Sequence, residues 1–184
     1  NFYNLTVGLG LGDSLPEKFF DLMYRAADAM IKISTPAFTQ PRTNDTYKIP
    51  TARFAKQATV VLGDAPEYRF VTSRRAEGAP PKGETASHFL PYAGFAAMRS
   101  DWGADATYMC FDVGPLGVAH IHQDMLNIII FKGNQQLIYD DGGGQYEQSD
   151  ARTYALSAYG HNTVLVDSLA QNRREPKRVS EPID

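Results

Sequence analysis

The hydrophobic pattern of this chain changes its period once, and that change limits the fold to a helical part followed by a β part. Over residues 15–34, apolar side chains recur at spacings of three and four, as they do along one face of an α-helix. Residues 51–62 and 64–73 continue the helical pattern, with Gly63 between them as a C-cap. Residues 76–87 follow as a linker that is rich in proline and charge and has no apolar period.

After the linker, the chain has the pattern of short β-strands. Runs rich in β-forming residues, bounded by Gly, Asp and Asn, occupy 94–99, 106–113, 126–131, 136–140 and 163–167. Lys132-Gly133-Asn134 indicates a tight turn between two of these runs. The predicted fold class is α+β, with helices in 1–75 and the first part of an antiparallel β-sandwich in 88–184. Because this sandwich is incomplete, we expect a longer natural protein.

Composition argues against several function classes. The 184 residues carry a net charge of −3, which argues against general binding to nucleic acid or to anionic membranes. No apolar run reaches the length of about 18 residues that a transmembrane helix needs. Cys110 is the single cysteine, so no intramolecular disulfide can form, and one thiol fits the cytoplasm and the periplasm equally well.

Most of the histidines lie in one segment, residues 114–167. His120 and His122 form a His-x-His pair, and in an extended strand two such side chains project from the same face. Asp140 and His161 come from other predicted strand ends, so His122, Asp140 and His161 are candidate metal ligands. Asp124 could orient one of the imidazoles. The alternative is that these histidines are ordinary surface or core residues.

A metal at His122 leaves His120 available as a general base, because a neutral imidazole titrates near neutral pH. Tyrosines are also frequent in this region. Most of them are expected to pack or to stack on carbohydrate, but one close to His120 would be able to transfer a proton. The candidates are Tyr139, Tyr146, Tyr154 and Tyr159.

A series of short motifs, in order along the chain, resembles the C-terminal β domain of the heparinase II/III-like polysaccharide lyases. The motifs are Met98-Arg99, Trp102-Gly103, Phe111-Asp112-Val113-Gly114-Pro115, His120-Ile121-His122-Gln123-Asp124, Asp140-Asp141-Gly142 and His161-Asn162-Thr163-Val164. Two positions depart from the family pattern. Ile121 stands where a small residue is usual, and Asp141 replaces a proline at the corner of the hairpin.

The resemblance implies that an (α/α) toroid precedes the β domain and that residues 1–75 are the last helices of this toroid. It also implies a periplasmic or secreted lyase that cleaves a uronic-acid-containing anionic polysaccharide or oligosaccharide, alginate or glycosaminoglycan, by β-elimination. Toroid residues that neutralise the substrate carboxylate have no counterpart here. We therefore expect this chain alone to be catalytically incomplete and the rest of the toroid to complete it.

By position, His120 resembles the catalytic histidine of that family, and Tyr154 resembles a catalytic or substrate-contacting tyrosine. Tyr3 resembles the tyrosine that acts as acid and base. The resemblance further implies a structural zinc site, which would hold the sheet in shape rather than perform the elimination. Its ligands would be His122, Asp140 and His161.

Two other function classes stay open. A cupin-like metalloenzyme would use both His120 and His122 as ligands, although the glutamate of the cupin motif is missing from the apolar run that follows. A non-catalytic carbohydrate-binding β domain is favoured by the tyrosines and by the missing toroid. Metal content of single histidine variants separates the first of these from a lyase, and product formation separates the second.

Overall fold

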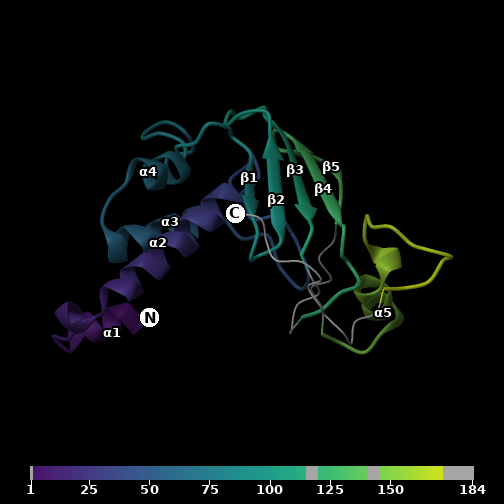
Figure 1. Ribbon diagram of the computed structural model, residues 1–184, viewed down its shortest axis with the longest axis horizontal. Helices are drawn as coiled ribbons and strands as arrows, with labels where there is room; N and C mark the ends of the chain where they lie inside the picture. Colours follow the sequence, from purple (N-terminus) through teal and green to yellow (C-terminus); the bar gives the residue numbers. More distant parts are fainter. Residues whose placement is uncertain (1, 115–119, 141–145, 172–184) are drawn as a thin grey trace. The chain divides into compact units, whose positions relative to one another are not determined.

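The computed structural model describes residues 2–114, 120–140 and 146–171 (Figure 1). The chain divides into two compact units. Asn1–Ile31 and Thr51–Pro81 form a helical unit, and Lys32–Pro50 and Lys82–Asp184 form a β unit. The sequence placed all of residues 1–75 in the helical part, but residues 32–50 of this range group with the sheet.

The helical unit contains the helices that the apolar periodicity predicts. They are α2 (Glu17–Lys32), α3 (Ala52–Leu62) and α4 (Pro66–Thr72), preceded by α1 (Phe2–Gly8) and a 3-10 turn, η1 (Gly12–Ser14). Gly63 ends α3 in the left-handed region, at φ 85°, as a C-cap glycine does. Pro66 begins α4, where a missing N–H costs nothing. Small and aromatic side chains fill the core, among them Ala55, Ala58, Tyr68 and Val71.

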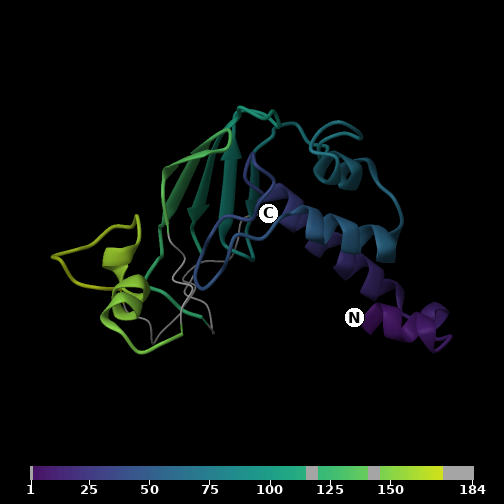
Figure 2. The same cartoon turned by 180° about the vertical axis from the view of Figure 1, so that it is seen from behind.

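The β unit is built on one five-stranded antiparallel sheet in the order β1-β2-β3-β4-β5 (Figures 1 and 2). The strands are β1 (His88–Leu90), β2 (Phe95–Arg99), β3 (Thr107–Asp112), β4 (Ile128–Lys132) and β5 (Gln135–Ile138). Four of them match predicted runs, and Lys132-Gly133-Asn134 makes the hairpin turn between the last two. β1 was not predicted. A second sheet, as a sandwich requires, is not found in the part of the chain that the structure describes.

The predicted strand at 163–167 is wrong. Only an isolated bridge between Val166 and Leu169 is found there, and the side chains of Val164 and Val166 are exposed. The run is rich in β-forming residues, but no described strand pairs with it. Such residues stabilise a strand mainly through packing against a neighbouring strand, and the described residues supply none here. A short helix, α5 (Asp150–Leu156), and a 3-10 turn, η2 (Ala158–Gly160), precede this run and were also not predicted.

Segment 32–50 is fixed to the sheet by the first two motifs of the family pattern. The Arg99 guanidinium donates to the carbonyl oxygens of Lys32 at 2.6 Å and Ser34 at 2.9 Å. It also lies 3.9 Å from the ring centroid of Trp102, as in a cation–π contact. The hydroxyl of the fully buried Tyr108 donates to the carbonyl of Ile33. These bonds hold the start of the segment, which then continues to the site described below.

Ile33 also joins the hydrophobic core of the β unit, with Ala97, Cys110 and Ile129 from the strands. Burial raises the pKa of the Cys110 thiol to about 12, so this cysteine is an inert core residue. Within the described ranges, no helix has both the length and the apolar character that crossing a membrane requires.

Candidate active site and metal centre

Asp45 is the residue around which the candidate site is organised, and it comes from segment 32–50. Its carboxylate is almost fully buried, with 4% of the side chain exposed. Oδ2 lies 3.0 Å from Nδ1 of His120, and Oδ1 lies 3.0 Å from Nε2 of His122. Arg152 donates to both carboxylate oxygens, the second at 2.9 Å. One buried carboxylate therefore holds two imidazoles and a guanidinium.

The charge of Asp45 is fixed by these partners. The Arg152 guanidinium, assisted by the hydrogen bonds from His120 and His122, holds the pKa of the Asp45 carboxyl far below its ordinary value although burial opposes this. In turn, the hydrogen bond with Asp45 raises the pKa of Arg152. Asp45 is therefore an acceptor across the physiological pH range, which lets it fix the tautomer of an imidazole.

Arg152 reaches Asp45 from α5. The Ser149 hydroxyl accepts from the backbone N–H of Arg152 at 3.1 Å, so it caps the first turn of this helix. The Arg152 guanidinium also lies 5.3 Å from the ring centroid of Tyr146. The helix thus presents a cation to the Asp45 carboxylate, and the ring of Tyr146, which precedes the helix, lies beside this cation.

His120 is the exposed member of the cluster, with 58% of its side chain accessible. Its Nδ1 lies 3.0 Å from the hydroxyl oxygen of Tyr146, and the two rings meet edge to face at 5.9 Å. Tyr146 is thus the tyrosine that lies close to His120, as the sequence allowed. Because Asp45 is ionised, it accepts the Nδ1 proton of a neutral imidazole and leaves Nε2 as the basic nitrogen.

The expectation of a strand at His120 and His122 is wrong. This segment is a loop between β3 and β4, and His120 has a left-handed φ of 54°. The two side chains still converge, because both bond the same carboxylate rather than because they share a strand face.

The other imidazole, His122, is completely buried and lies beside His161. Nδ1 of His122 is 3.3 Å from Nε2 of His161. Donor atoms of His122, Asp124 and His161 all lie within 4.8 Å of one another. Two nitrogens with a carboxylate oxygen are a donor set that zinc accepts, and ligands bonded at about 2.0–2.2 Å in a tetrahedron lie at such separations. The residues therefore fit a metal ion.

Asp140 contacts this group through the second nitrogen of His161. Its Oδ2 lies 2.8 Å from Nδ1 of His161 and accepts from the Asn127 amide at 2.7 Å. Asp124, in turn, accepts from the side-chain amide of Asn44 at 2.9 Å. The structure thus brings together the predicted residues His122, Asp140 and His161, and it adds Asp124 as a further carboxylate on the same imidazoles.

Burial and neighbouring charges shift the pKa values of these groups in different directions. Burial lowers the pKa of His122, and the Asp45 hydrogen bond offsets this only in part. Burial alone would lower the pKa of His161 as well, but its hydrogen bond with Asp140 raises it. Burial raises the pKa of Asp124. A neutral His122 has the protonation state that a metal ligand needs.

Of the two tyrosines to which the family resemblance gives a role, Tyr154 belongs to the unit that carries this cluster and Tyr3 to the other unit. The Tyr154 side chain is 60% exposed on α5, and the described residues show no contact between it and His120. Tyr3 lies in the helical unit, where its ring stacks on Phe19 at 6.5 Å. Both roles stay predictions. Asp141, Gly142 and Pro115, which belong to the motifs, lie outside the described residues.

Sequence reasoning missed Asp45 and the part that Arg152 plays. Asn44-Asp45 reads only as a turn signal, and nothing local links it to a histidine pair 75 residues away. The helix that carries Arg152 did leave a signal. Ser149-Asp150 is an N-cap followed by an acidic first turn.

Comparisons with known proteins agree with this picture. A heparin-sulfate lyase of Bacteroides stercoris is 24% identical over 173 residues, which cover 90% of this chain and 26% of that protein. A solved heparinase III gene product superposes with a TM-score of 0.77 at 23% identity, over 86% of this chain and 26% of its own. The solved heparan sulfate lyase of Pedobacter heparinus superposes with a TM-score of 0.77 at 22% identity, over 90% of this chain and 27% of its own.

These solved structures confirm the fold class of helices followed by an antiparallel β domain. The chain spans about a quarter of the length of the relatives it matches. The family model described as heparinase II/III-like, C-terminal, matches residues 82–182, more than half of the chain. On that match, the chain belongs to the heparinase II/III-like C-terminal family.

Proposed function

We propose that the complete natural protein containing this sequence is a polysaccharide lyase that acts on a glycosaminoglycan of the heparin or heparan sulfate type. Family membership and the lyases named among its relatives support this reaction class. The observation that carries the proposal is the half-exposed His120, whose Nδ1 is held by a buried, ionised Asp45 and by Tyr146.

The proposed reaction is a β-elimination at a uronic acid. A base removes the C5 proton, the C4–O bond breaks, a C4–C5 double bond forms, and the leaving oxygen takes up a proton. His120 suits the first or last of these transfers, since Asp45 fixes Nδ1–H and leaves Nε2 to accept or return a proton. Tyr146 Oη lies 3.0 Å from the same Nδ1, so it is a second oxygen beside the Nδ1–H group and helps to orient the imidazole. The group that neutralises the substrate carboxylate would come from outside this chain.

We further propose that His122 and His161 hold a metal ion, with zinc as the expected ion. When bound, it would join the loop before β4 to the segment after η2, and with Asp140 as a further ligand also to the segment after β5. Asp45 then acts on His122 as an outer carboxylate, bonded to the nitrogen turned away from His161. The ion would hold these segments in place, and the imidazole of His120 would transfer the proton.

Asp124 and Asp140 compete for the role of carboxylate ligand. Asp124 is one of the three residues whose donor atoms lie close together, whereas Asp140 matches the family pattern and bonds His161. Metal content of Asp124→Asn and Asp140→Asn separates the two assignments. The ligand's variant is expected to lose the metal, and the other to keep it with roughly 10- to 100-fold weaker affinity.

The test of function uses the complete protein, with heparan sulfate as substrate and ultraviolet absorbance of unsaturated products as readout. We expect His120→Ala to abolish product formation with metal content unchanged. His88→Ala, a histidine in β1 outside the cluster, is the matched control and should retain activity. Loss of metal in His120→Ala with activity retained would reverse the roles of the two histidines. Wild-type protein that binds heparan sulfate but forms no product would instead support a carbohydrate-binding domain.

A further inference from the structure

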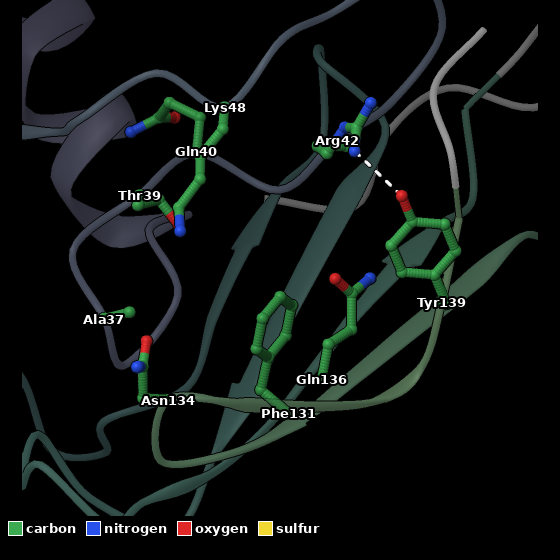
Figure 3. A pocket seen from close by; sticks show the side chains of 9 residues that line it. All are labelled: Ala37, Thr39, Gln40, Arg42, Lys48, Phe131, Asn134, Gln136 and Tyr139. Carbon is green, nitrogen blue, oxygen red and sulfur yellow. Dashed lines mark hydrogen bonds between the residues drawn. The ribbon is translucent and has the colours of Figure 1, made fainter.

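A separate cavity of about 250 Å³ lies in the β unit between segment 32–50 and the last two strands of the sheet (Figure 3). Phe131 and Gln136 rise from β4 and β5 toward the segment that carries Gln40, Arg42 and Lys48. The nine residues that line the cavity are Ala37, Thr39, Gln40, Arg42, Lys48, Phe131, Asn134, Gln136 and Tyr139.

The lining is cationic. Arg42 and Lys48 contribute two positive charges, and none of the nine described lining residues is acidic. Side-chain amides supply further donors from Gln40, Asn134 and Gln136. The neighbouring candidate site, by contrast, contains the carboxylates of Asp45, Asp124 and Asp140. An oxyanion therefore meets two cations and no carboxylate in the described lining of the cavity.

Arg42 is held in place by Tyr139. Its Nη1 donates to the tyrosine hydroxyl at 2.9 Å, and its guanidinium carbon lies 5.9 Å from the ring centroid (Figure 3). A guanidinium has five N–H donors, which match the planar oxygen pairs of carboxylate and the oxygens of sulfate or phosphate. Phe131 and Tyr139 add apolar faces beside these donors, as binding sites with a few placed polar groups do.

The cavity and the candidate active site are built from the same segments. Arg42 precedes Asp45 by three residues, and Tyr139 directly precedes Asp140, so these last two Cα atoms lie about 3.8 Å apart. A chain of anionic units can contact both places at once, which a single small anion cannot.

We propose that this cavity is a binding subsite for one oxyanion of an anionic saccharide chain whose reacting unit lies at His120. The oxyanion is either a sulfate ester or a uronate carboxylate, which Arg42 and Lys48 bind alike. The inference rests on the proposed function for the identity of the chain, but the binding step itself does not require turnover.

The experiment measures binding rather than catalysis. The complete protein carrying His120→Ala is titrated with a heparan sulfate hexasaccharide and with its desulfated counterpart, by calorimetry at two salt concentrations. Arg42→Gln is expected to weaken binding about tenfold, the effect of losing roughly one charged hydrogen bond. Lys48→Gln should weaken it about threefold and reduce the salt dependence. Lys82→Gln removes one charge from an exposed position in the same unit and is the control.

Arg42→Gln also removes the contact with Tyr139, so weaker binding by this variant could reflect a local structural change. Lys48→Gln is a second test without this effect, since no described hydrogen bond joins Lys48 to Tyr139. A loss confined to the sulfated ligand assigns the subsite to a sulfate ester, and an equal loss with both ligands assigns it to the carboxylate. Binding by Arg42→Gln and Lys48→Gln that equals that of Lys82→Gln would overturn the inference. Product formation by the protein with His120 intact is scored separately, so a failed lyase proposal with Arg42-dependent binding leaves the subsite standing.

Discussion

Asp45 Oδ1 lies 3.0 Å from Nε2 of His122, although 77 residues separate the two in the sequence. The other oxygen of the same carboxylate lies 3.0 Å from His120. The proposed proton-transfer residue and the proposed metal ligand are thus oriented by one side chain from segment 32–50. A single substitution at Asp45 is expected to disturb both.

Asp45→Asn keeps the shape of the side chain but removes its charge. We expect kcat/KM to fall by about 10- to 100-fold, in the range seen when a group that orients a ligand or base is changed. Metal affinity should weaken as well, because His122 loses its outer carboxylate. Kinetics and metal analysis of the complete protein test this, with exposed Asp105→Asn as the control. Unchanged activity in Asp45→Asn would show that the contact with His120 has no part in the reaction.

Tyr146 and Tyr154 can be distinguished by removing one hydroxyl at a time. Tyr146→Phe should lower kcat by about 10- to 100-fold, the range expected when a group that orients a functional imidazole is removed, while the ring contact with His120 is retained. Tyr154→Phe should have a smaller effect, since its side chain is exposed and has no described contact with His120. The reverse order would restore Tyr154 to the catalytic role that the family resemblance implies.

Arg99→Lys should destabilise the β unit by weakening the attachment of segment 32–50 to the sheet. A lysine keeps the charge but loses the planar guanidinium that stacks on Trp102 and bonds two carbonyl groups. We expect a loss of about 2 kcal/mol in the free energy of unfolding, of the size expected when hydrogen bonds from a charged group are lost. Urea denaturation measures it, and Lys82→Arg serves as the surface control. Equal stability of Arg99→Lys and wild type would mean that segment 32–50 is held by other contacts.

The buried carboxyl of Asp112 makes the stability of the β unit decrease as pH rises. Burial raises its pKa from 3.8 to about 7, against the hydrogen bond that it accepts from the Gly114 N–H. The folded state therefore holds a proton that the unfolded state has released, and stability falls as pH rises from about 4 to about 7. Asp112→Asn should raise the melting temperature more at pH 8 than at pH 5, as calorimetry at both values can measure. An equal gain at the two pH values would contradict the raised pKa.

The regular elements were predictable because their signals are local. Apolar spacing predicted α2, and Gly63 and Pro66 mark the end of α3 and the start of α4. Runs rich in β-forming residues and a turn signal between them predicted β4 and β5. The run at 163–167 has the same composition but no neighbouring described strand, and composition carries no information on whether a partner is present.

The residues of the candidate site could be predicted only where the sequence around them has a recognisable pattern. His122, Asp140 and His161 were candidate ligands from their residue types and expected strand ends, the family pattern contains the same three residues, and the structure brings them together. Asp45 was not found, because its role depends on a loop contact that no spacing rule encodes. The histidine pair also shows that a correct pairing can be predicted for a wrong reason, since His120 adopts a left-handed backbone instead of an extended one.

The strand order has a consequence for how the molecule assembles. Every strand pairs with its neighbour in sequence, so the sheet can grow by successive short hairpins with little loop-closure entropy to overcome. Segment 32–50, which is synthesised first, can dock only after β2 and β3 exist, because Arg99 and Tyr108 hold it. Recovery of activity during refolding is therefore expected to lag behind recovery of β structure. The length of this lag would measure how long segment 32–50 takes to dock on the sheet.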